Sequence, residues 1–170
     1  MCTTPGPGPE GCGPTPLPPV TEQEGPVSHA IVRVGRLHRI LAGQLLRRVG
    51  LHPAQELVLM QLWDHGPQRQ SDLARVLGAD AATMTRTVKR LEQGGFVRRS
   101  PSPTDKRVTI VEATTASQGL KARVEQIWQE LERSVVADLD QGERTTVLDV
   151  LGRMEQGLEQ ALRRARADQD

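Results

Sequence analysis

The sequence predicts a mainly α-helical fold with one β-hairpin, and three observations lead to this prediction. After residue 26, most stretches place apolar residues three and four positions apart, which is the period of an amphipathic helix. Residues 96–113 instead alternate apolar and polar residues around a turn-forming cluster. Aromatic residues make up only 2% of the chain, so the core must be aliphatic, which favours helices packed on helices.

The 170 residues suit one domain, preceded by a tail. Residues 1–26 hold eight of the twelve prolines and too little apolar sequence to order themselves, so we expect a disordered Pro/Gly-rich segment. Cys2 and Cys12 both lie in it, which argues against a disulfide framework or a redox-sensing thiol. The sequence shows neither a signal peptide nor an apolar run able to cross a bilayer, and this predicts a cytoplasmic protein without membrane contact.

Two helices are predicted at the start of the domain, which we place at residues 27–165. The first covers residues 27–50, where Gly50 is expected to end it. Its apolar stripe is formed by Ile31, Val34, Leu37 or His38, Leu41 and Leu45. The second is predicted to begin at Pro53, because a missing N–H costs nothing in the first turn, and to end at Gly66.

Two further helices complete a helix-turn-helix plan. The shorter one is predicted to run from Ser71, its N-cap, to Gly78. The next has Asp80 as N-cap and ends at Gly94. At about 100° per residue, its inner face is formed by Met84, Val88 and Leu91.

The outer face of this last helix has two interpretations. It carries Ala82, Arg86, Lys89 and Gln93, flanked by Thr83 and Thr85. Taken alone, a charged helix face is more often simply solvated. In the functional interpretation, the small residues let the helix approach a DNA duplex, where Arg86 and Lys89 reach guanine edges or phosphates in the major groove.

The hairpin favours the functional interpretation. Residues 96–100 and 106–113 are predicted strands joined by a turn, with Val108 and Ile110 alternating with polar neighbours. A hairpin directly after a helix-turn-helix is a wing. Residues 86–107 contain seven basic and two acidic side chains, a net charge of +5, whereas residues 129–170 have a net charge of −4. Such segregation creates a positive surface suited to a polyanion.

Residues 51–114, "LHPAQELVLMQLWDHGPQRQSDLARVLGADAATMTRTVKRLEQGGFVRRSPSPTDKRVTIVEAT", resemble the winged helix-turn-helix core of the MarR family of bacterial transcriptional regulators. The resemblance extends over roughly residues 28–163. Its most specific element is the wing motif D-x-R, here Asp105 to Arg107, and it implies that Arg107 enters the minor groove while Asp105 orients it. Residues two apart on a strand share a face, and a narrow minor groove attracts Arg. The expected DNA-binding residues are Ser71, Ala82, Thr83, Thr85, Arg86, Lys89, Arg90, Asp105, Lys106 and Arg107.

Two positions depart from the family pattern. His52 stands where a capping Thr is usual, and Ser117 stands where a Gly commonly follows the second wing strand. Neither is an expected DNA contact, but they leave the helix starts around them open.

Residues 27–50 and 114–165 are expected to be dimerisation helices around a winged core at residues 52–113. The simpler interpretation is that the helices after the wing only cover the winged domain. Their stripes, together with that of the first helix, exceed what a small winged module can bury, which favours a second subunit. The resemblance implies the same two-fold homodimer. Its recognition helices would reach major grooves about 34 Å apart, and this predicts a pseudo-palindromic operator on double-stranded DNA.

The resemblance also implies a small phenolic or other aromatic acid as ligand. Arg33, His38 and Trp63 could supply a cation, a donor and an apolar wall, although we favour the simpler explanation that Trp63 is a core residue and Arg33 is solvated.

Catalytic and metal-binding patterns find little support. The four histidines lack metal-ligand spacing, and no glycine-rich phosphate loop precedes a helix. We therefore expect no enzyme, no cofactor and no metal. The sequence predicts a sequence-specific transcriptional regulator, with repression as the favoured sign. The alternative is a winged-helix protein-interaction module that uses the basic face for an acidic partner.

Overall fold

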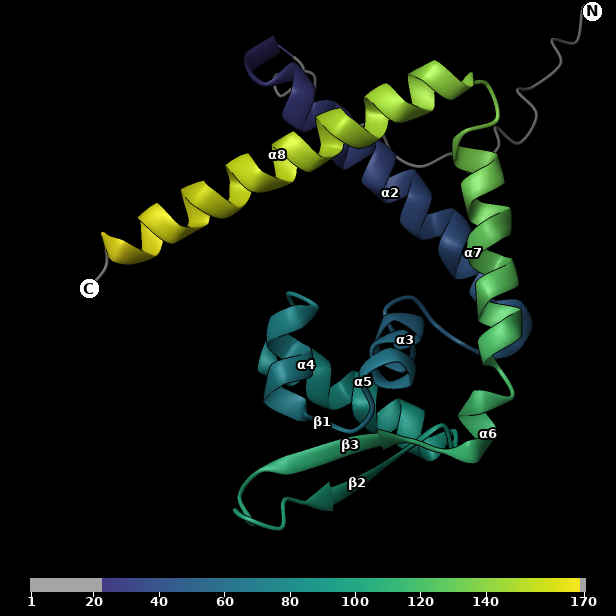
Figure 1. The fold of residues 1–170 in the computed structure, drawn as a ribbon, viewed down its shortest axis with the longest axis vertical. Coiled ribbons are helices and arrows are strands. Elements are labelled where there is room, and N and C mark those ends of the chain that lie inside the picture. The colour runs from purple at the N-terminus through teal and green to yellow at the C-terminus, as the bar shows by residue number, and fades with distance from the viewer. Residues whose placement is uncertain (1–22, 169–170) are drawn as a thin grey trace, which may run out of the picture. The chain divides into compact units, whose positions relative to one another are not determined.

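The computed structural model describes residues 23–168, and these form a mainly helical chain with one small sheet (Figure 1). The predicted tail, with Cys2 and Cys12, falls almost entirely outside the described residues. The chain divides into two compact units, residues 1–40 and residues 41–170. Each unit is described by itself.

In the first unit, the described chain is dominated by helix α2, Pro26–Leu46, whose last six residues belong to the second unit. The helix begins at Pro26, the residue that we had assigned to the end of the tail. Proline suits this first position because its ring fixes a helical φ angle. The predicted stripe residues Ile31, Val34 and Leu37 are all exposed in the chain.

In the second unit, α2 passes through a short 3-10 turn, Arg47–Val49, and ends at Gly50, where φ is 74°. Helix α3, Gln55–His65, begins two residues later than predicted. Pro53 is not its first residue, because Ala54 takes a left-handed conformation with φ 74°. The Gln55 side chain accepts a hydrogen bond from the His52 N–H at 2.8 Å, whereas Ala54 at the N-cap position makes no side-chain capping bond.

Helices α4, Gln70–Val76, and α5, Ala81–Gln93, form the predicted helix-turn-helix. Ser71 is not the N-cap of α4, since the helix begins one residue before it and Arg69 occupies the cap position. Gly78 turns the chain with φ 62°. The prediction for α5 is confirmed: the Thr83 N–H donates to Asp80 Oδ1 at 2.8 Å, and the apolar inner face is buried at Met84, Val88 and Leu91.

The sheet has three antiparallel strands in the order β1-β3-β2: Gln68–Arg69, Thr109–Ala113 and Val97–Pro101. The short strand β1 was not predicted. It makes β3 the central strand, and the fully buried residue of β3 is Val111 rather than Val108 or Ile110. The second wing strand begins at Thr109, so Asp105 and Arg107 lie in the preceding turn and do not share a strand face.

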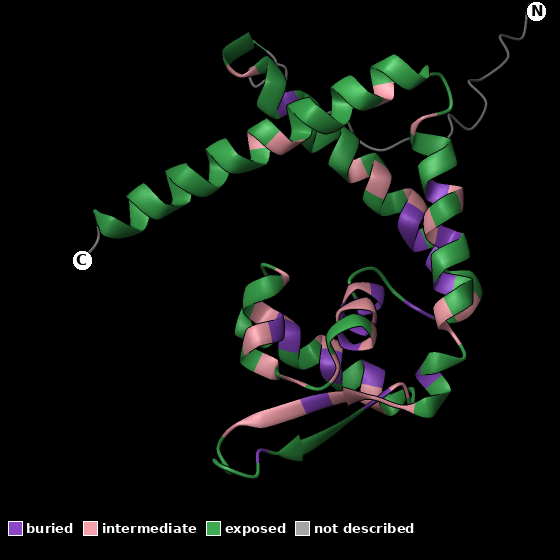
Figure 2. Ribbon diagram, viewed as in Figure 1, coloured by how far each residue is buried: buried purple, intermediate pink, exposed green. Residues whose placement is uncertain are grey.

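The core of the second unit is aliphatic, as the composition predicted. Figure 2 marks the buried residues along its helices and strands. Helices α3 and α4 pack against β3, and α5 packs against β2. Helix α7, Lys121–Val135, adds Val124, Ile127 and Leu131 to the core. The short helix α6, Thr115–Gln118, contributes Ser117, which is fully buried. The Ser117 hydroxyl accepts a hydrogen bond from Trp63 Nε1 at 3.2 Å and donates one to the Thr114 carbonyl at 2.8 Å. The serine side chain therefore forms two hydrogen bonds at a position where the family commonly has Gly.

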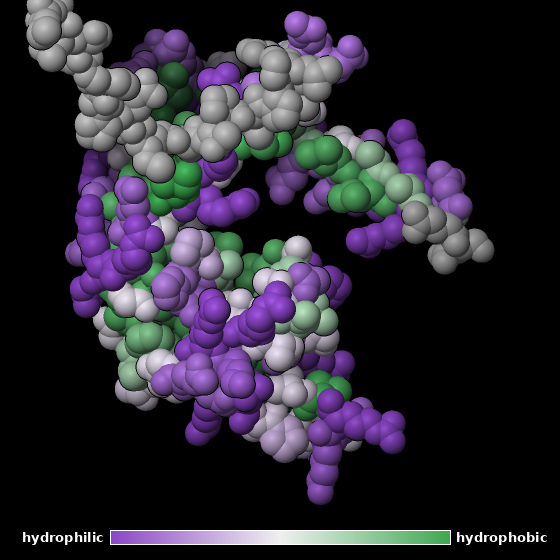
Figure 3. All heavy atoms as spheres, turned by 180° about the vertical axis from the view of Figure 1, so that it is seen from behind, coloured by the Kyte–Doolittle hydropathy of each residue, from purple (hydrophilic) through white to green (hydrophobic). Residues whose placement is uncertain are grey.

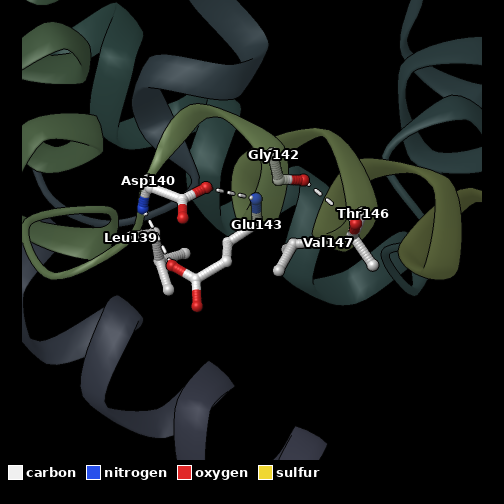
Figure 4. Close-up of a pocket in the computed structure, with 6 residues that line it drawn as sticks. All are labelled: Leu139, Asp140, Gly142, Glu143, Thr146 and Val147. Atoms are coloured by element: carbon white, nitrogen blue, oxygen red, sulfur yellow. Dashed lines mark hydrogen bonds between the residues drawn. The ribbon is translucent and has the colours of Figure 1, made fainter.

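Helix α8, Gln141–Ala167, begins with a capping box. Asp140 Oδ1 accepts from the Glu143 N–H, and Glu143 Oε2 accepts from the Asp140 N–H, both at 2.9 Å (Figure 4). None of its residues is buried. Hydrophobic side chains gather between hydrophilic ones along this helix (Figure 3), and Leu148 and Leu158 are 71% and 61% exposed. Within residues 23–168, no helix combines the length and apolar character needed to span a membrane.

Candidate nucleic-acid interface

The outer face of α5 is exposed as the helical period predicted. Ala82, Arg86 and Lys89 are exposed, opposite the buried inner face. The N-cap fixes the start of the helix, and hydrogen bonds from the Thr83 side chain and N–H hold the pKa of Asp80 below its usual range. The carboxylate therefore stays charged at the positive end of the helix dipole.

Thr83 and Thr85 of α5 both form hydrogen bonds within the fold. Thr83 Oγ1 accepts from Arg86 Nη2 at 2.9 Å, which orders the guanidinium along the exposed face. Thr85 Oγ1 donates to the Ala81 carbonyl at 2.7 Å and accepts from Gln70 Nε2 at 3.0 Å. Thr85 thus ties α5 to the first residue of α4. This role of Gln70 could not be predicted from the sequence, because no sequence pattern pairs residues fifteen positions apart on two helices.

Two of the expected DNA-binding residues lie apart from the centre of this face. Ser71 is exposed near the start of α4. Arg90 lies one turn after Arg86 and lines a shallow pocket of about 210 Å³ with His52, Gln55 and Gln93, among others. Arg90 is therefore at the end of α5 remote from its N-cap.

The wing turn is held by Asp105. Its Oδ1 accepts from the Arg107 N–H at 2.9 Å, and its carbonyl accepts from the Val108 N–H at 2.9 Å. The aspartate therefore fixes the backbone at Arg107 and does not use the N–H groups of the Arg107 guanidinium in this bond. Lys106 and Arg107 are both exposed at this tip.

The charge of the predicted positive surface is reduced by two ion pairs. Arg98 pairs with Glu112 at 2.9 Å across the hairpin, and Arg99 pairs with Glu92 at 2.5 Å. The Arg99 side chain lowers the pKa of Glu92, and Glu92 raises the pKa of Arg99. The other five basic residues of the segment 86–107 form no salt bridge within residues 23–168. We call these five residues the basic surface: Arg86, Lys89, Arg90, Lys106 and Arg107.

The three expected ligand-binding residues fall in different units. Arg33 and His38 lie on the part of α2 that belongs to the first unit. Trp63 lies in α3 of the second unit, where it packs against the core and bonds to Ser117. This placement agrees with the simpler explanation that Trp63 is a core residue. In the described part of the chain, no group of three or more His, Cys, Asp or Glu could hold a metal ion.

Comparisons with known proteins agree on one family. The family model described as MarR family matches residues 51–109. The transcriptional repressor NicR of Pseudomonas putida is 31% identical over 135 residues, which cover 79% of this chain and 84% of NicR. A mutant MarR from E. coli, solved in complex with operator DNA, superposes with a TM-score of 0.74 at 26% identity, over 79% of this chain and 97% of that one. Bordetella bronchiseptica BpsR, whose DNA binding is regulated by 6-hydroxynicotinic acid, superposes with a TM-score of 0.69 at 25% identity, over 76% and 92% of the two chains.

Proposed function

The chain belongs to the MarR family of DNA-binding transcriptional regulators, and on this premise we propose that it is a repressor that binds a pseudo-palindromic operator as a homodimer. The observation that carries the proposal is the basic surface. Its five cations lie on α5 and the wing tip, without carboxylate partners in the described chain, whereas the neighbouring Arg98 and Arg99 are neutralised. Unpaired cations on an exposed helix and an adjacent hairpin suit a phosphate backbone.

Each part of the surface has a distinct role in the proposal. Helix α5 enters the major groove, where Arg86 reads a base edge and Lys89 contacts a base edge or a phosphate. Ala82 leaves room for the close approach of the backbone. Arg107 enters the adjacent minor groove, positioned by the backbone hydrogen bond to Asp105.

The homodimer is supported by the exposed apolar residues of helix α8. Val147, Leu151, Leu158 and Leu162 repeat at spacings of four and seven on α8, and all are exposed in the single chain. A stripe of this length on a solvent-facing helix is typical of an interface. Two-fold pairing of the chains then presents two copies of α5 to successive turns of the duplex.

The direction of regulation, repression rather than activation, and the class of ligand are proposed from relatives. NicR is named a repressor, and BpsR responds to 6-hydroxynicotinic acid. We propose that a small aromatic acid likewise releases this protein from its operator, with Arg33 and His38 as candidate contacts on α2.

Selection of bound duplexes from a random pool tests the function. We expect enrichment of an inverted repeat whose half-sites lie one helical turn apart. If no sequence were enriched, the basic surface would be a generic one, as in a protein that docks an acidic protein partner, and the proposal would be wrong.

A further inference from the structure

The carboxylate of Glu92 lies between the two parts of the basic surface, helix α5 and the wing turn. Glu92 is in the last turn of α5, and Arg99 is the third residue of β2, the strand that leads into the wing turn. Lys106 of the wing turn lines the same shallow pocket as these two residues. The contact between Glu92 and Arg99 therefore lies where the recognition helix meets the wing.

Three hydrogen bonds make this contact. Glu92 Oε2 accepts from Arg99 Nε at 2.9 Å and from Arg99 Nη2 at 2.5 Å, and Glu92 Oε1 accepts from the Arg99 backbone N–H at 3.2 Å. Because β2 is an edge strand, some of its N–H groups have no strand partner. The carboxylate thus holds both the side chain and the backbone of one strand residue, which fixes position and orientation together.

The second ion pair of the hairpin provides a natural comparison. Arg98 and Glu112 face each other across β2 and β3, so their bond acts within the hairpin only. The Arg98 side chain is 71% exposed, whereas those of Arg99 and Glu92 are 35% and 33% exposed. Of these two ion pairs, the one between Glu92 and Arg99 connects the hairpin to α5.

We propose that Glu92 is a positioning residue: through Arg99 it holds the wing at a fixed angle to α5, so that both reach DNA in one binding event. The proposal rests on the proposed function, since it concerns the same surface. A wing that is already oriented loses less freedom on binding, and preorganisation of this kind raises affinity without a new contact.

The proposal makes a prediction opposite in sign to that of simple electrostatics. Replacing Glu92 by Gln removes a negative charge from a positive surface and releases the Arg99 cation, so charge alone predicts tighter DNA binding. Loss of the fixed wing angle predicts weaker binding to the operator. The direction of the change therefore distinguishes the two effects.

The test compares Glu92→Gln with the matched variant Glu112→Gln in the full chain. Each removes one carboxylate that pairs with an Arg of β2. Dissociation constants are measured by fluorescence anisotropy for the selected operator and for its scramble at one salt concentration, and thermal melting confirms that each variant is folded. We expect Glu92→Gln to bind the operator about tenfold more weakly and the scramble no more weakly, whereas Glu112→Gln keeps operator affinity.

A double-mutant cycle with Arg99→Gln locates the effect. If Glu92 acts through Arg99, the double variant binds the operator about as well as Arg99→Gln alone. Additive losses, or a Glu92→Gln variant with unchanged or tighter operator binding, would overturn the positioning role while the parent still discriminates operator from scramble. A parent that binds both duplexes equally would overturn the proposed function, and this inference with it.

Discussion

Arg98 and Arg99 are neighbours in β2, yet their guanidinium groups bond to carboxylates on different elements. Charge counting along residues 86–107 treats both as part of the positive surface, but only tertiary structure brings Glu112 and Glu92 to them. Asp105 shows the reverse case: the wing motif predicts that it orients Arg107, and its hydrogen bond in the structure goes to the Arg107 backbone. Residue types were predictable from the sequence, whereas their partners depended on the turns and strand ends.

Two arginines of the basic surface, Arg86 and Arg107, are expected to differ in the DNA features that they contact. Arg86→Ala should weaken operator binding by roughly 1 to 3 kcal/mol and relax the preference at one base position, because a base-edge contact discriminates between bases. Arg107→Ala should weaken binding to operator and scramble more evenly, because the minor groove offers a degenerate pattern. Both effects are measured by titration of single-base variants of the operator. Equal losses on operator and scramble for both variants would contradict the assigned roles.

At the scale of elements, helical periodicity predicted α5, α7 and α8, because each carries its signal within a few turns. Helix α4 was predicted from capping and stop residues instead, and its start was displaced by one residue. The two-residue strand β1 gives no such signal, and it exists only because Gln68 and Arg69 pair with Val111 and Ile110. The start of α3 was displaced for a local reason, the left-handed Ala54, which is unusual for a non-glycine residue. The core of α5 was predicted correctly because its buried positions follow from the period alone.

The first turn of α3 contains a buried charge that affects stability. Glu56 is buried, and its Oε2 has no hydrogen-bond partner among the described residues. Burial raises the pKa of this carboxyl, partly opposed by backbone N–H groups at the helix start. The folded state therefore binds the proton more tightly than the unfolded state, and stability falls as pH rises from the usual carboxyl range through the raised folded pKa.

Glu56→Gln should remove this pH-dependent loss. We expect the variant to be more stable than the parent at pH 7 by on the order of 1 kcal/mol, and the difference to shrink as pH falls through the raised folded pKa toward the usual carboxyl range. Thermal unfolding from pH 4 to pH 7 measures the difference. Glu125→Gln, an exposed carboxylate on α7, serves as the control and should show no such trend. A difference between Glu56→Gln and the parent that is constant with pH would refute this account.

At the scale of the whole molecule, a chain with a net charge of only +1 carries a net charge of +5 over residues 86–107, which include α5 residues and the wing turn. The separation keeps the protein nearly neutral while it presents a local field to a polyanion. The apolar residues are similarly separated, since α8 leaves its stripe exposed in the single chain. Both features are explained together if two chains pair through their outer helices and present two basic surfaces to one duplex.

Leu158→Glu should abolish this pairing, because it places a charge in the middle of the apolar stripe. Size-exclusion chromatography with light scattering should give twice the chain mass of 18.6 kDa for the parent and the single chain mass for the variant. The control is Gln156→Glu, which adds the same charge on the opposite side of α8 and should remain a dimer. A Leu158→Glu protein that keeps the parent mass would place the interface elsewhere.

The central claim is that this chain recognises a DNA sequence through α5 and its wing. Its most direct test is a titration of the selected operator and its scramble with the parent protein at fixed salt. The account predicts that the dissociation constant for the operator is lower than that for the scramble by a factor of roughly a thousand or more. Equal dissociation constants for the two duplexes would contradict it.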